Sequence, residues 1–156
     1  MTELGHLLVA DGLLLQHGGQ YFAVPSKHVL QIAELRAGEI KTVGRSRVAV
    51  LRGKCHAAVW LDEVLGMDPS GIARTGNCSG LVLCSNQDSV CLLAERVLGC
   101  RKIVVKAVDG VSAGTPKGIR VASSKTAGVA HLGGNRLAIV LNVPELLKSV
   151  HKRGDA

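Results

Sequence analysis

The chain has 156 residues and a mass of 16.3 kDa, which fits one domain of ordinary size or two very small lobes that share a core. Because hydrophobic residues make up 47% of the sequence and charged residues 20%, intrinsic disorder is excluded. The formal net charge of +7 would suit nucleic acid, but aromatic residues are only 2% of the chain and offer unpaired bases almost nothing to stack on. A solvated basic surface is therefore the favoured interpretation of the charge.

Short apolar segments separated by glycine-containing turns predict a mainly β chain. Hairpins are expected around Gly18, around Gly53 and around Gly134, and a further hairpin around the polar turn at Asn86. The predicted strands are 13–16, 21–24, 29–32, 47–51, 55–61, 80–84, 89–93, 103–105, 128–132 and 137–141.

Two helical segments are predicted, and a long connection precedes the last two strands. Asp62 is expected to cap a single turn that Gly66 ends. Asn142 is expected to cap a terminal helix with Pro144 in its first turn. The connection over 110–125 is rich in Gly, Ser and Thr, and we expect it to form a loop.

The five cysteines form no C-x-x-C pair, so the sequence predicts neither a zinc site nor a disulfide framework. Cys84 and Cys91 lie inside apolar runs and are expected to be small core residues. Reduced thiols and the lack of an export signal predict a cytoplasmic protein. The apolar stretch 7–15 is broken by Asp11 and Gly12 and is too short to span a bilayer.

The order of elements repeats within the chain. Residues 22–30 align without gaps on 90–98, with matching apolar positions. The turn at 52–53, the strand ending at 61 and the pair 64–65 parallel the turn at 133–134, the strand ending at 141 and the pair 146–147. Two copies of a strand-rich unit predict two small barrels, and we expect a shared apolar seam because neither lobe buries much alone.

Four motifs in order cover nearly the whole chain. The opening 9–14 is followed by 19–25, and the Arg-Gly turn of 51–53 is followed by 59–61 and 64–66. Segment 89–99 leads into the triplet 104–106, and 133–143 forms the closing strand and its exit into the last helix. The sequence resembles the CheW-like adaptor domains of bacterial chemotaxis. It is most similar to the C-terminal regulatory domain of the histidine kinase CheA, because Pro25 and the triplet 104–106 match the pattern of that domain.

The chain departs from that pattern at four positions. The proline common after the Arg-Gly turn is Ala57, the glycine common in the second-half strand is Cys91, and two usual aspartates are replaced by Glu95 and Asn142. Since a glycine often marks a close approach of the backbone, we expect the change at Cys91 to affect the fit between the lobes.

The resemblance implies an all-β fold of two intertwined five-stranded SH3-like barrels with a short C-terminal helix. Residues 1–156 would form one such domain, with flexible ends at 1–11 and 151–156. The implied function is non-catalytic: an adaptor that couples chemoreceptors to the CheA kinase. Its partners would be CheW, the CheA kinase, or both, and the cytoplasmic tips of chemoreceptors. Contact with the membrane would be indirect, and no nucleic acid, cofactor or metal is implied.

Carried over position by position, the resemblance places partner contacts at Val29, Gln31, Ile32, Arg52 and Gly53. An amphipathic receptor helix is expected in the seam, and exposed strands at either end would meet another copy. Val29 and Ile32 are also consistent with a purely structural role in the core. Gly53 is also consistent with a structural role in its turn, where it would supply a positive φ.

Two alternatives stay open. A basic SH3-like barrel could bind nucleic acid, with an affinity that falls steeply with salt. A metal-dependent enzyme could use the Cys and His residues, although Cys55 and His56 are neighbours on a strand and would point to opposite faces. The sequence contains no nucleotide-binding loop and no nucleophile elbow.

Overall fold

The structure is a computed structural model that describes residues 2–4, 7–67, 76–106 and 125–154. The expectation of flexible ends at 1–11 and 151–156 stays a prediction. Among the described residues the elements are, in chain order, β1 (Thr2–Leu4), β2 (Leu7–His17), β3 (Gln20–Pro25), the 3-10 turn η1 (Ser26–His28), β4 (Val29–Leu35), the 3-10 turn η2 (Ala37–Glu39), β5 (Ile40–Val43), β6 (Ser46–Leu51), β7 (Lys54–Trp60), α1 (Leu61–Leu65), β8 (Cys78–Ser85), β9 (Asp88–Ala94), β10 (Arg96–Lys106), β11 (Thr126–Gly133), β12 (Arg136–Leu141) and α2 (Val143–Gly154).

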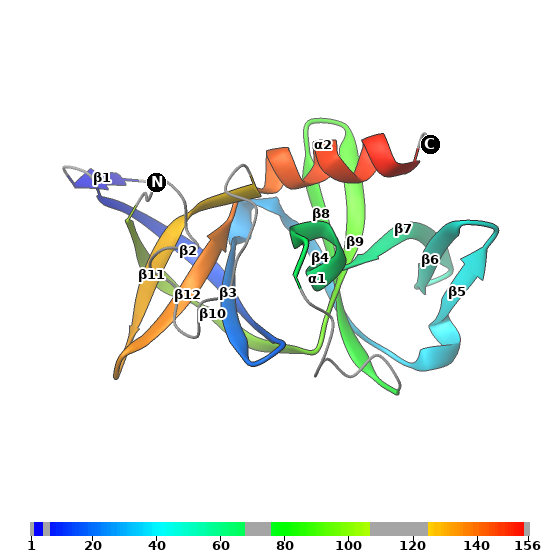
Figure 1. The fold of residues 1–156 in the computed structure, drawn as a ribbon, viewed down its shortest axis with the longest axis horizontal. Helices are drawn as coiled ribbons and strands as arrows, with labels where there is room; N and C mark the ends of the chain where they lie inside the picture. Colours follow the sequence, from blue (N-terminus) through cyan, green and yellow to red (C-terminus); the bar gives the residue numbers. More distant parts are fainter. Residues whose placement is uncertain (1, 5–6, 68–75, 107–124, 155–156) are drawn as a thin grey trace.

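The strands form two six-stranded sheets, seen as two lobes in Figure 1. The first lobe has the order β1-β2-β10-β11-β12-β3, and the additional pairing of β2 with β3 closes five of these strands into a barrel. The second lobe has the order β4-β8-β9-β7-β6-β5. The predicted mainly β fold with a C-terminal helix is therefore confirmed.

The second lobe differs from the expected closed barrel. Its end strands β4 and β5 do not pair with each other among the described residues. One pairing in the ring of the first-lobe barrel joins β11 to β10, at Ala130 and Val105. The corresponding strand β6 pairs instead with the additional strand β5, at Ala49 and Ile40. The strand β5 thus occupies the edge of β6 with which β4 would have to pair to close the second lobe.

The strand pairing confirms the predicted internal repeat. The parallel pair Val140 with Ala23 in the first lobe corresponds to the parallel pair Ala58 with Cys91 in the second. An irregularity between Val29 and Gln31 in β4 recurs between Val97 and Gly99 in β10. Each repeat contributes its first hairpin to one lobe and its remaining strands to the other, so the two lobes are intertwined as predicted.

The core has three parts. The largest cluster is the predicted seam, and residues from both sheets and both helices meet there, among them Leu15, Phe22, Leu83, Leu92 and Leu146. A second cluster fills the interior of the first lobe, and a third fills the second lobe around Trp60. Because the seam belongs to both lobes, neither has a complete core without the other.

Two predicted elements are corrected. The strand expected over 103–105 extends back to Arg96 because β10 pairs with β2 along most of its length. Asp62 does not cap α1, which begins at Leu61, but is buried within it.

The predicted ends of the two helices are confirmed. Gly66, in the left-handed conformation, ends α1. The Asn142 side chain accepts a hydrogen bond from the Glu145 amide at 3.2 Å, as expected for the cap of α2. The predicted loop 110–125 lies outside the described residues except for Lys125.

Cys91 does not lie in the seam, where a poor fit was expected. Its side chain is fully buried in the interior of the second lobe, in the cluster around Trp60. A Cβ added to Gly80 would lie 3.1 Å from the Cys91 sulfur and 2.7 Å from a Leu35 methyl carbon. These two neighbours thus fill the space beside Gly80. The cysteine at position 91 is therefore accommodated inside the second lobe and does not alter the contact between the lobes. The prediction that Cys91 is a core residue is confirmed, whereas Cys84 is only half-buried.

We expect the thiols to differ sharply in reactivity. Burial raises the pKa of Cys91 to about 12, so its thiolate is scarce at neutral pH, and burial also raises the pKa of Cys78. Cys55 and Cys100 are exposed. Titration of the folded protein with a thiol reagent at pH 8 should give two fast equivalents from Cys55 and Cys100, a slower one from the half-buried Cys84, and slow or absent reaction at Cys78 and Cys91. Fast reaction at Cys91, identified by peptide mapping, would contradict this assignment.

Candidate functional site

The strand β4 lies at one edge of the second lobe and carries three of the predicted contact residues. Val29 and Ile32 pair with Leu83 and Leu81, which belong to the seam, whereas Gln31 pairs with Val82 in the lobe interior. Directly paired residues share a face, so Gln31 faces away from Val29 and Ile32. Val29 is half-buried against the seam, while Ile32 is 46% exposed.

Sequence reasoning missed Leu30, which is 66% exposed on the same strand. The irregularity between Val29 and Gln31 turns this residue out of the regular alternation of the strand. The matching residue of the second repeat, Leu98, is 40% exposed at the equivalent irregularity of β10. An apolar residue at both sites was the only signal in the sequence.

Arg52 and Gly53 form the turn between β6 and β7, and the structure does not bring them to β4. Their φ angles of 49° and 79° are both in the left-handed region, as a two-residue hairpin turn of this kind requires. Glycine has an evident backbone role at position 53, and the exposed Arg52 side chain remains available for contacts. The five predicted contact residues therefore fall into two groups.

The seam is not an open groove among the described residues. Its cluster consists of side chains that are at most 9% exposed, drawn from both lobes. The margin of the seam is formed by partly buried apolar residues that pack against this cluster, namely Val29, Met67, Val97 and Val150. The expected binding of a receptor helix at the seam stays a prediction.

The polar centre of the molecule is a buried network on His17. Its Nδ1 accepts the Glu95 amide at 3.1 Å, so the ring proton is on Nε2 and is donated to the Asp62 carboxylate at 2.8 Å. Glu95 in turn accepts the Gly18 amide at 2.6 Å, and the His17 ring stacks on Trp60. This network joins the β2–β3 turn to α1 and to the start of β10. The departure at Glu95 thus carries a structural role.

The network offers no catalytic arrangement, since both ring nitrogens of His17 are engaged by an amide and a carboxylate rather than by a nucleophile. Cys55 pairs with Val50 and His56 with Ala49, on opposite faces of the sheet as predicted. Within the part of the chain that the structure describes, no three His, Cys, Asp or Glu side chains gather as a metal ion would need. None of the helices described has both the length and the apolar character needed to cross a membrane.

The chain is similar to known proteins in both sequence and fold. The family model of the CheW-like domain matches residues 11–151. The fold is similar to that of the scaffolding protein TtCheW from Thermoanaerobacter tengcongensis, with a TM-score of 0.62 and 10% sequence identity over 86% of this chain and 90% of that one. No curated protein matches the sequence.

Proposed function

Because the chain belongs to the CheW-like domain family, we propose that it acts as a chemotaxis adaptor that joins chemoreceptor tips to the CheA kinase. The domain is a non-catalytic scaffold, so it would act by holding partners together. In this proposal it works in the cytoplasm, and it reaches the membrane only through the receptors.

The observation that carries the proposal is the apolar edge of β4. Leu30 and Ile32 are exposed there, beside Val29 at the margin of the seam. Exposed aliphatic side chains on an edge strand fit the apolar stripe of an amphipathic receptor helix. We propose Val29, Gln31 and Ile32 as the receptor-binding strand, with Leu30 added to it. Arg52 and Gly53 are proposed to contact a different partner, since they lie on another element.

Replacement of Ile32 by aspartate is expected to weaken binding of a chemoreceptor tip by about tenfold or more, because it places a charge in an apolar contact. Gln31→Ala should have a smaller effect, since Gln31 faces the other side of the strand. The measurement is a pull-down of purified receptor tip, with melting curves for each variant. Val43→Asp, at a residue 64% exposed on β5, is the matched control for receptor binding.

If the parent protein captures neither the receptor tip nor CheW nor CheA, the adaptor function is wrong. If Ile32→Asp stays folded and captures receptor as the parent does, the receptor surface lies elsewhere. Salt-sensitive binding of nucleic acid in place of these partners would favour the alternative of a nucleic-acid-binding barrel.

The finer assignment within the family is also a proposal. Pro25 and the triplet 104–106 resemble the CheA regulatory domain more than CheW and support placing the chain in the CheA branch. Reading the genomic frame upstream of Met1 tests this, because kinase motifs there would make the chain a part of CheA.

A further inference from the structure

The buried ring of His17 lies between two carboxylates and one backbone amide. Its Nε2 donates to Asp62 at 2.8 Å, and its Nδ1 accepts the Glu95 amide at 3.1 Å. The side-chain Oε1 of Glu95 is also close, 4.0 Å from Nδ1, but it accepts the Gly18 amide at 2.6 Å. Because the ring is fully buried, protein groups surround both of its nitrogens. The charge of the ring therefore determines which of these contacts can form.

The contact at Nδ1 is the one that requires the neutral ring. An amide can donate to this nitrogen only while the nitrogen keeps its lone pair. Protonation would place a donor at Nδ1 opposite the Glu95 amide, which is also a donor, and the bond would be lost. The carboxylates of Asp62 and Glu95 have the opposite effect, because a negative charge within about 4–6 Å stabilises an imidazolium. The neutral and the charged ring thus each have contacts that favour them.

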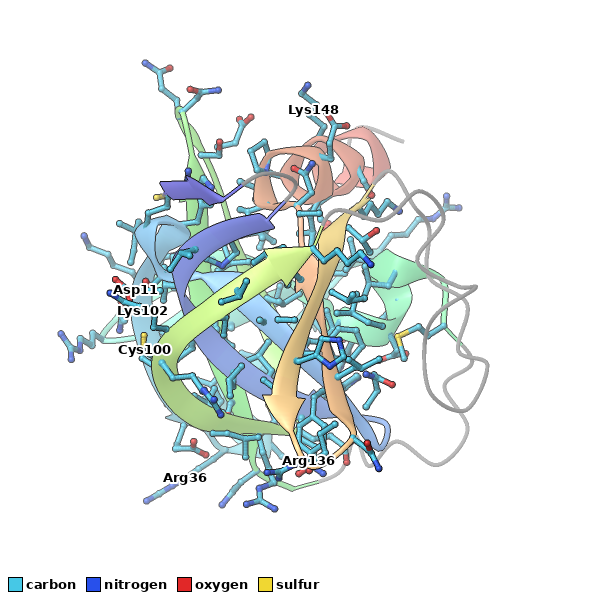
Figure 2. All side chains as sticks on the ribbon, turned by 90° about the vertical axis from the view of Figure 1, so that its left-hand side faces the viewer. Asp11, Arg36, Cys100, Lys102, Arg136 and Lys148 are labelled. Carbon is cyan, nitrogen blue, oxygen red and sulfur yellow. The ribbon has the colours of Figure 1, made fainter. Side chains whose placement is uncertain are left out.

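Other charged side chains on the elements packed around the ring are bound elsewhere. These contacts are Glu63 with Arg47 at 2.6 Å, Lys125 with the Val64 carbonyl at 2.7 Å, and Arg136, labelled in Figure 2, over the Tyr21 ring at 5.8 Å. Arg96, the first residue of β10, is exposed. Asp62 and Glu95 are thus the carboxylates placed to respond to a charge on His17.

We propose that His17 is a pH switch in the contact between the two lobes. In the neutral state the ring connects the β2–β3 turn of the first lobe to α1 and to the corner between β9 and β10. In the charged state Nδ1 takes up one proton from water and releases the Glu95 amide. The new N–H is donated to the Glu95 carboxylate, which moves away from the Gly18 amide. The bond to Asp62 stays, whereas the two backbone amides lose their partners.

The direction of the switch follows from the number of bound protons. The charged state binds one proton more than the neutral state, so its population grows as the pH falls, and the neutral state dominates at higher pH. Histidine is the side chain that ordinarily changes charge between pH 5 and 8. We therefore expect the transition in that range.

The backbone that the switch releases leads to the margin of the seam. Glu95 is followed by Val97, which packs against the seam cluster, and by Leu98, which is 40% exposed at the irregularity of β10. Loss of the Glu95 amide bond frees the start of this segment. The seam cluster itself consists of apolar side chains that do not titrate. Acid should therefore loosen the margin of the seam while both lobes stay folded.

Nuclear magnetic resonance on the full chain measures the switch directly. At pH 8 the nitrogen signals of the His17 ring should be those of a neutral imidazole with its proton on Nε2, and the signals of an imidazolium should replace them by pH 5. Over the same range, the protection of the Gly18 and Glu95 amides from hydrogen exchange should fall by about tenfold or more. The amide of Leu92, a fully buried residue of the seam cluster, is the control and should keep its protection.

The single tryptophan reports the same event by fluorescence. Trp60 stacks on the His17 ring with the ring centres 6.0 Å apart, so protonation would place a cation at the indole, and a charged imidazole quenches indole emission. The emission of the parent should fall between pH 8 and 5. His17→Gln keeps a donor for Asp62 and an acceptor for the Glu95 amide but does not titrate, so its emission should stay level.

Two carboxylate variants test the part played by Glu95. Glu95→Gln keeps an oxygen for the Gly18 amide but removes the charge that would receive the new N–H, so the transition should move to lower pH by about one unit. Asp11→Asn is the matched control, because it removes one negative charge on the same strand as His17, about 20 Å away along the strand. Figure 2 shows Asp11 beside Lys102, its partner in the strand register. This variant should keep the transition of the parent.

The switch is disproved if the ring stays neutral down to pH 5 in the folded protein, or if it becomes charged while the Gly18 and Glu95 amides keep their protection. A fluorescence transition that persists in His17→Gln, or one that Glu95→Gln leaves at the same pH, would also overturn it. If His17→Gln does not fold, the ring signals and amide exchange of the parent decide alone. No partner takes part in these measurements, so their outcome is independent of the proposed function.

Discussion

Replacing His17 by alanine is expected to destabilise the protein by about 3–5 kcal/mol. The ring is fully buried, and it donates to the Asp62 carboxylate while it accepts the Glu95 amide. The substitution removes a hydrogen bond to a buried carboxylate and leaves the volume of the ring empty beside Trp60. Urea denaturation at pH 7, followed by circular dichroism, measures the change in the free energy of unfolding.

Lys148→Ala provides the control for this substitution. Lys148 is 67% exposed and pairs with Glu145 at 3.3 Å on the surface of α2, so its loss should cost about 0–1 kcal/mol. A cost at His17 no larger than the cost at Lys148 would show that the buried network does not hold the β2–β3 turn, α1 and β10 together.

Replacing Phe22 by alanine is expected to lower the free energy of unfolding by about 3–5 kcal/mol. Phe22 is fully buried in the seam cluster, to which residues of both lobes belong. Because that cluster is shared, the variant should still unfold in one transition, at a lower midpoint, rather than lose one lobe first.

Calorimetry, compared with denaturation followed by the single tryptophan in the second lobe, tests this expectation. Val43→Ala, at an exposed position, should change the free energy of unfolding by less than about 0.5 kcal/mol. Separate transitions for the two lobes would mean that the seam does not couple them.

Much of the secondary structure could be predicted because its signals are local. The glycine pair at Gly18 and the Arg52–Gly53 turn adopt the left-handed backbone that tight hairpins need, and apolar segments on either side become strands. Asn142 caps α2 through an amide three residues away. The order of these elements, which occurs twice in the chain, was enough to predict two small barrels with a common seam, whereas their intertwining was implied only by the family resemblance.

The candidate contact residues were predicted only by family resemblance, and their arrangement was not. A single irregularity in β4 exposes Leu30, and strand alternation then sets Gln31 apart from Ile32.

The sequence by itself determined the hairpins, the two helices, the aliphatic core and the repeated order, because turn geometry and apolar spacing act between near neighbours. Only the tertiary structure decided that β5 takes the edge of β6 and leaves the second lobe open. It also decided that Asp62, which locally resembles a helix cap, is bonded instead to His17, 45 residues earlier in the chain. Such choices depend on which distant groups meet in the folded core, where a buried carboxylate must find a donor, and no local pattern specifies that partner.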